Sequence, residues 1–156
     1  QTSYYGVTDT WLYSALSELN RPLGRVAVIS LGSIQPWYEC IALSLGAQEV
    51  VVYDYNDPPC GKQLHDYPVF YRPARDICKD TNRYDVVINI SSVEHNGLGR
   101  YGDPCDGAGD MRVMADMSRI MNKDTVMFLA VPIGKDTVVW NAHRIYGKLG
   151  LARLTC

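Results

Sequence analysis

Short, nearly continuous apolar runs alternate along the chain with segments whose apolar residues recur at helical spacing. Such runs are typical of strands buried on both faces of a parallel sheet, and the periodic segments are typical of covering helices. The alternation therefore predicts an α/β fold with a Rossmann-like, doubly wound parallel sheet. The predicted strands cover residues 25–32, 49–56, 68–72, 84–90 and 125–133, and the predicted helices cover residues 8–20, 36–46 and 108–121.

The connections between these strands predict the order in which they pair. Right-handed crossovers and a change of direction after the first strand give the order 3-2-1-4-5. In such a sheet, ligands bind beyond the carboxyl ends of the strands, near the point where the strand order reverses. Four connections are expected to share that edge, namely residues 31–37, 54–56, 91–110 and 132–136.

Composition limits what else the chain can be. Its 156 residues are expected to form a single domain, 1–156, and the first residue, Gln1, suggests a fragment or a processed product. The formal net charge of −2 gives no electrostatic reason to expect a nucleic acid or a membrane as partner, and the compartment stays undetermined. The five cysteines are widely spaced without a CxxC pair, so no structural metal site is expected.

A nucleoside site is predicted where the first two strands end. Gly32 ends the first strand and a helix begins at Pro36, so backbone amides can face a ligand there. Asp54 follows Gly32 by about 20 residues, the spacing at which an acid accepts hydrogen bonds from ribose hydroxyls. Glycines that would cradle a pyrophosphate are absent, so S-adenosylmethionine fits better than NAD. The expected cofactor contacts are Gly32, Ser33, Asp54 and Tyr55.

The connection 91–110 is unusually rich in charge and in glycine, with four carboxylates, one histidine and five glycines. Because glycine loses the most backbone entropy on folding, so many in one loop indicate unusual backbone angles or the close approach of a ligand. His95 is a candidate general base near neutral pH, and Glu94 is a candidate partner that orients it. His143, from the connection after the fifth strand, is expected to converge on the same pocket.

Structural roles compete with these functional ones. His95 can instead close the end of the fourth strand, in which case it contacts no ligand. Asp103, Asp106 and Asp110 can bind a hard cation through oxygen, but Asp106 and Asp110 also stand where a residue caps the following helix. Because their spacing matches no known cation loop, we expect capping here and no metal.

Three stretches of the chain resemble one protein family. "GSIQPWYECIALSLGA", "SSVEHNGLGRYGDPCDGAGDMR" and "FLAVPIGKDTVVWNAHRIYG" are similar to the DUF268 family, known from nematodes and also found elsewhere. The resemblance runs from about Tyr5 to Leu151. Members are similar to class I S-adenosylmethionine-dependent methyltransferases, which implies that fold, with Gly32 and Asp54 in the usual cofactor positions. That fold ends in an antiparallel pair of strands, so the resemblance also implies that C-terminal strands are missing here.

The sequence therefore predicts a methyltransferase that uses S-adenosylmethionine to methylate a small hydroxylated acceptor, with a carbohydrate as one candidate. His95, Glu94 and His143 are the predicted catalytic residues. Two other functions stay open. A non-catalytic binding or scaffold domain is favoured by the shortened glycine loop after the first strand. An NAD-dependent oxidoreductase is disfavoured by the absent glycines.

Overall fold

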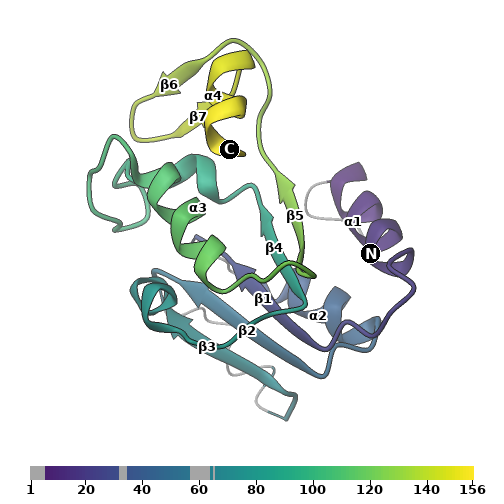
Figure 1. Cartoon of the computed structure of the whole chain (residues 1–156). Coiled ribbons are helices and arrows are strands. Elements are labelled where there is room, and N and C mark those ends of the chain that lie inside the picture. The colour runs from purple at the N-terminus through teal and green to yellow at the C-terminus, as the bar shows by residue number, and fades with distance from the viewer. Residues whose placement is uncertain (1–5, 32–34, 57–63, 65) are drawn as a thin grey trace.

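Five parallel strands form one sheet in the order β3-β2-β1-β4-β5 (Figure 1), so the predicted strand order and α/β class are confirmed. The computed structural model describes residues 6–31, 35–56, 64 and 66–156, and the predicted cofactor contacts Gly32 and Ser33 lie outside these residues. The strands are β1 (Arg25–Ile29), β2 (Glu49–Asp54), β3 (Val69–Pro73), β4 (Val86–Ile90) and β5 (Val126–Ala130).

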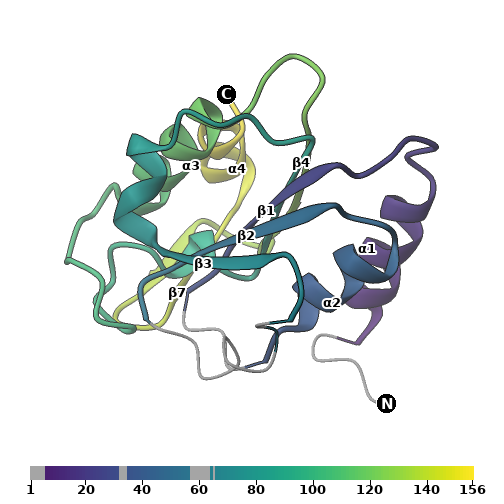
Figure 2. The same cartoon turned by 90° about the horizontal axis from the view of Figure 1, so that it is seen from below.

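Helices cover both faces of this sheet (Figure 2), which explains why the central strands β1 and β4 are apolar except for Arg25 and Asn89. One face packs against α1 (Val7–Ser17) and α2 (Trp37–Ser44), and the other against η2 (Ala74–Lys79) and α3 (Gly109–Arg119). Side chains alternate between the faces along each strand, so Val28 lies in the first core and Ile29 in the second. No helix in the described residues has the length and apolar composition needed to cross a bilayer.

After β5 the chain leaves the sheet and forms a small unit beyond its carboxyl edge (Figure 1). The unit consists of the antiparallel strands β6 (Thr137–Val139) and β7 (His143–Ile145), followed by α4 (Lys148–Leu154). The first turn of α4 lies against Asp136, whose carboxylate accepts hydrogen bonds from the N–H groups of Gly147 (2.7 Å) and Gly150 (2.9 Å).

The sequence gives no signal for this C-terminal unit, because strands of three residues show no periodicity. β6 and β7 pair with each other and not with the five-stranded sheet. Within the described residues, that sheet therefore contains parallel strands alone, and its last strand along the chain, β5, lies at one edge.

A network of polar side chains around Asp80 links β2, β3 and the segment before β4 on the α3 face of the sheet. The Oδ2 atom of Asp80 accepts hydrogen bonds from the hydroxyls of Tyr53 and Tyr84 (2.8 Å to Tyr84) and pairs with Arg72 (2.8 Å). Burial alone would raise the pKa of Asp80. The hydrogen bonds from Tyr53, Tyr84 and the Asn82 N–H, together with the charge of Arg72, instead lower it to about 2.

This lowered pKa makes the fold depend on acidity. The ionised Asp80 stabilises the folded state above its ordinary pKa of 3.8, and this stabilisation is lost as the pH falls towards about 2. Asp80→Asn is expected to lower the free energy of unfolding at neutral pH, and its difference from the wild type is expected to shrink as the pH falls through that window. Urea unfolding at a series of pH values measures this difference. A difference that stays constant with pH would contradict the assignment.

Candidate functional site

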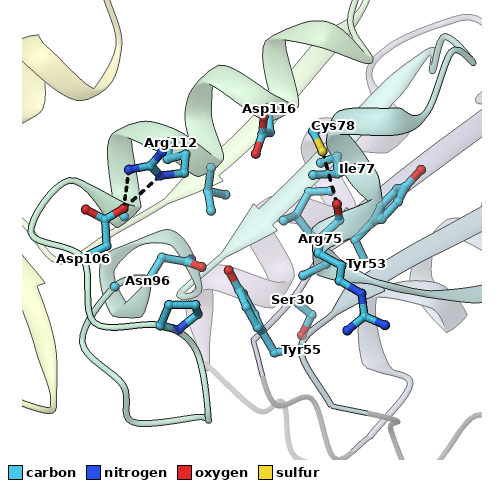
Figure 3. A pocket seen from close by; sticks show the side chains of 16 residues that line it. Ser30, Tyr53, Tyr55, Arg75, Ile77, Cys78, Asn96, Asp106, Arg112 and Asp116 are labelled. Carbon is cyan, nitrogen blue, oxygen red and sulfur yellow. Dashed lines mark hydrogen bonds and ion pairs between the residues drawn. The ribbon is translucent and has the colours of Figure 1, made fainter.

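A cavity of about 390 Å³ opens at the carboxyl edge of the sheet, on the side covered by α3 (Figure 3). Residues that follow β1, β2, β3 and β4 contribute to its walls, among them Ser30, Tyr55, Ile77 and Asn96. Its walls include residues that follow β1 and β4, the two strands between which the strand order reverses. Doubly wound sheets bind their ligands at such a reversal, and the volume lies within the range of about 300–1,000 Å³ usual for small-molecule sites.

The two predicted cofactor residues that the structure describes lie on opposite sides of the end of β2. Tyr55 lines the cavity, as does Tyr53 two residues earlier. Asp54 is buried but is not among the residues that line the cavity, and its Oδ1 atom accepts a hydrogen bond from the N–H of Asn56 (3.0 Å). This follows from the two-residue period of a strand, which turns neighbouring side chains to opposite faces. β2 therefore gives the cavity aromatic surface, while its carboxylate lies on the α2 side.

Glu39, in the first turn of α2, is a buried acid near Asp54 that sequence reasoning missed. It is 1% exposed, and no group among the described residues donates a hydrogen bond to its Oε1 atom. Burial, with a further contribution from the negative charge of Asp54, raises the pKa of Glu39 to about 7. An acid in a first helical turn is ordinarily explained by the helix dipole, so its position in the sequence carried no other signal.

One acid of the connection 91–110 holds the loop itself. Asp103 is buried, and its carboxylate accepts hydrogen bonds from the N–H groups of Gly97 (2.7 Å), Gly99 (3.2 Å) and Tyr101 (3.2 Å). Three backbone N–H groups can meet one carboxylate because the chain curls tightly, with Gly97, Gly99 and Gly102 all at positive φ. These three glycines therefore serve the backbone conformation around Asp103.

The next two acids of the loop also have partners within the protein. Asp106 accepts a hydrogen bond from the N–H of Ala108 (3.0 Å) just before α3 and pairs with Arg112 (2.7 Å; Figure 3). Asp110 accepts a hydrogen bond from the hydroxyl of Tyr146 (3.0 Å). Across the described part of the chain, no three His, Cys, Asp or Glu side chains are grouped so that they could hold a metal ion. Both acids thus contribute to the local structure around the start of α3.

Arg144, on β7, binds the loop from the side of the C-terminal hairpin. Its guanidinium is buried and donates to the carbonyl oxygens of Glu94 (3.3 Å), Asn96 (2.6 Å) and Gly107 (3.3 Å). The Nε atom also lies 3.4 Å from a carboxylate oxygen of Asp110. One side chain therefore fastens both ends of the glycine-rich loop to the hairpin.

His95 is held by the same hairpin. Its Nδ1 atom lies 2.5 Å from the carbonyl oxygen of Ala142. Because a carbonyl oxygen can only accept, Nδ1 carries the proton, and the neutral ring keeps its lone pair on Nε2. Nε2 lies 3.7 Å from Oε1 of Glu94, and that oxygen accepts a hydrogen bond from the hydroxyl of Ser91 (2.8 Å). The tautomer of His95 is thus the one that a general base acting through Nε2 requires.

The three predicted catalytic residues lie together. Besides the contact with Glu94, the ring of His95 lies edge-on to that of His143, with 6.2 Å between centroids, and edge-on to Tyr101 at 5.4 Å. None of the three predicted residues lines the 390 Å³ cavity, but Asn96, the residue after His95, does. The cavity and the His95 cluster are therefore neighbouring parts of one edge rather than one pocket.

Asn89 is a further positioning residue that sequence reasoning missed. It is fully buried in β4, where its amide nitrogen donates to the carbonyl of Ile29 (3.4 Å) and its amide oxygen accepts from the N–H of Val93 (3.2 Å). These bonds fix the end of β1 relative to the short helix η3 (Val93–His95) that carries Glu94 and His95. A single polar residue within an otherwise apolar strand was the signal that could have revealed it.

A comparison with protein families identifies the family of this chain. The chain belongs to the family described as "Caenorhabditis protein of unknown function, DUF268", which matches it over residues 25–156. The matched region includes all five strands of the sheet and the whole His95 cluster. A comparison with curated proteins gives no match.

Alanine substitutions at two loop glycines distinguish the energetic cost of left-handed backbone conformation from the cost of steric crowding. Gly97 and Gly102 have nearly equal φ angles, 83° and 85°. A Cβ atom on Gly97 would lie 2.0 Å from the carbonyl oxygen of Asp106, whereas one on Gly102 would meet nothing within 4 Å. Gly102→Ala is expected to cost only left-handed strain, about 1–2 kcal/mol of unfolding free energy. Gly97→Ala also has to displace the chain at Asp106, so its loss in urea unfolding should be clearly larger. Equal losses would show that crowding at Gly97 is unimportant.

Proposed function

We propose that this chain is an S-adenosylmethionine-dependent methyltransferase that acts on a small hydroxylated acceptor. The observation that carries the proposal is the cavity at the reversal of strand order. Asn96, the residue after His95, lines this cavity. Its size suits a nucleoside ligand, and Tyr55 offers an aromatic face on which adenine can stack.

The end of β2 supplies the groups that would hold the adenosine part of the cofactor. Tyr55 would contact the base from within the cavity. Asp54 lies outside the cavity on the α2 side, so the ribose would have to pass the carboxyl end of β2 for its hydroxyls to donate hydrogen bonds to this carboxylate. When bound, S-adenosylmethionine would supply an electrophilic methyl group. A donor of this kind needs no pyrophosphate cradle, in keeping with the lack of a three-glycine motif in the sequence.

His95 would take the proton of the acceptor hydroxyl on Nε2 as the bond from oxygen to the methyl carbon forms and the bond from that carbon to the sulfonium sulfur breaks, leaving S-adenosylhomocysteine. Glu94 supports this role, since its Oε1 atom lies 3.7 Å from Nε2 and would stabilise the ring once it is charged. The other carboxylate oxygen of Glu94 is buried, and no group in the described residues donates a hydrogen bond to it. Buried carboxylate oxygens normally have a donor, so a hydroxyl of the acceptor would satisfy it.

A non-catalytic binding domain is the second candidate. It is favoured by the loop acids Asp103, Asp106 and Asp110, all of which have partners within the protein. Calorimetric titration of the protein with S-adenosylmethionine separates the two. Saturable binding supports the methyltransferase, whereas no binding of either S-adenosylmethionine or S-adenosylhomocysteine would favour the scaffold.

The role of Asp54 can be tested in the same titration. Asp54→Ala removes an acceptor of two charge-assisted hydrogen bonds and is expected to weaken S-adenosylmethionine binding by on the order of 2–4 kcal/mol. Asp124→Ala is the matched control, because Asp124 is an exposed acid just before β5, at the opposite edge of the sheet. If the two variants bind equally well, Asp54 does not hold the ribose.

The role of His95 requires turnover and stability to be measured on one preparation. As the general base, His95 should be worth roughly 10²–10⁴-fold in turnover, so His95→Ala is expected to lose that factor while cofactor affinity changes little. If His95 only closes the end of β4, the same variant would melt at a lower temperature and turn over normally per folded molecule.

A further inference from the structure

Trp140 occupies the turn of the β6–β7 hairpin. Val139 pairs with His143, and three residues connect them, with Asn141 in the left-handed conformation at φ 53°. A hydrogen bond from the N–H of Ala142 to the carbonyl of Val139 (3.0 Å) closes the turn. The position of Trp140 is therefore set by a defined turn and not by a free loop.

The same turn holds the candidate base. The carbonyl oxygen of Ala142 lies 2.5 Å from Nδ1 of His95, and the ring of His143 is edge-on to that of His95. Trp140 precedes Ala142 by two residues, so their Cα atoms are at most about 7 Å apart. The backbone of Trp140 thus lies close to the residue that holds the candidate base.

This indole is not used to stabilise the fold. Trp140 is 74% exposed, and the neighbouring Val138 is 62% exposed. Tryptophan is normally among the more buried residue types, and a large exposed ring beside a candidate site indicates a ligand surface. The charged groups near His95 are the carboxylate of Glu94 and the guanidinium of Arg100, which lies over Tyr101. Because their charges are opposite, an uncharged polar ligand is favoured over an ionic one.

A sugar ring has the two properties that a ligand of this surface needs, an apolar face and polar groups around it. Its C–H face is flat and apolar and can stack on an indole, while its hydroxyls point outward around the rim. A ring stacked on Trp140 would carry several hydroxyls close to His95, whereas a purely apolar ligand would bring none.

We propose that Trp140 is the stacking platform for a sugar ring of the acceptor, so that the acceptor is a saccharide whose hydroxyl is presented to His95. This inference rests on the proposed methyltransferase function for the reaction, but the saccharide site itself can be tested without the cofactor. It assigns Trp140 to acceptor binding and not to the chemical step.

The chain provides a matched control for the test. Trp11, on α1, is 67% exposed, similar to Trp140, and it is separated from the hairpin by the sheet edge (Figure 1). Trp140→Ala and Trp11→Ala therefore remove equally exposed indoles from two different places. Both variants are titrated with cellotriose, mannotriose and chitotriose at millimolar concentrations, with binding followed by saturation-transfer NMR on the saccharide.

The expected result is that the wild type and Trp11→Ala bind at least one of these saccharides, and that Trp140→Ala binds it about tenfold more weakly. No binding of any of the three by the wild type, or equal binding by both variants, would overturn the inference. Saccharide binding that requires Trp140 in a protein that does not bind S-adenosylmethionine would leave the platform standing and remove the methyltransferase. If the protein binds S-adenosylmethionine but its saccharide binding does not depend on Trp140, the proposed methyltransferase function stands and the role of Trp140 falls.

Discussion

The buried guanidinium of Arg144 determines how the carboxyl edge of this protein is organised. The carbonyl groups that it binds come from Glu94, Asn96 and Gly107, which belong to two ends of one loop, and Arg144 itself belongs to a hairpin that forms no part of the main sheet. Removing one partner of a buried charged network costs on the order of 3–5 kcal/mol, because the remaining groups stay desolvated without a partner. The loop and the hairpin should therefore keep or lose their arrangement together, and the His95 cluster depends on that arrangement.

The sequence predicted the frame of the fold well because the frame depends on local patterns. Strands such as β4 are buried along their whole length and almost entirely apolar since both faces are covered. Parallel pairing with right-handed crossovers then leaves few possible strand orders. The same reasoning placed His95 at the carboxyl edge, and His95, Glu94 and His143 do lie together. What the sequence could show was which residues share an edge.

The details of that edge depend on contacts between residues far apart in the chain. His95 and Ala142 are 47 residues apart, and no local pattern indicates that one fixes the tautomer of the other. Asp103 lies in a charged, glycine-rich loop, where an acid is a candidate ligand-binding residue. Its carboxylate instead accepts hydrogen bonds from backbone N–H groups of the same loop. The position of Glu39 in the first turn of a helix suggests an interaction with the helix dipole. Its side chain is instead buried beside Asp54 and has a pKa of about 7. In each case the residue type and its place in the sequence were poor guides to the role of the side chain, because its burial and its contacts decide its chemistry.

Asn89 has a consequence outside the site. Together with Ile90 and Ser91 it forms an Asn-X-Ser sequence, the acceptor for N-linked glycans. In the folded protein, however, Asn89 is fully buried and both ends of its amide are engaged with the backbone of Ile29 and Val93. An oligosaccharide on that nitrogen would break the bond to β1 and would not fit between the covering layers. Occupancy of this sequon would therefore be incompatible with the native sheet, and a glycosylated chain would be a misfolded one.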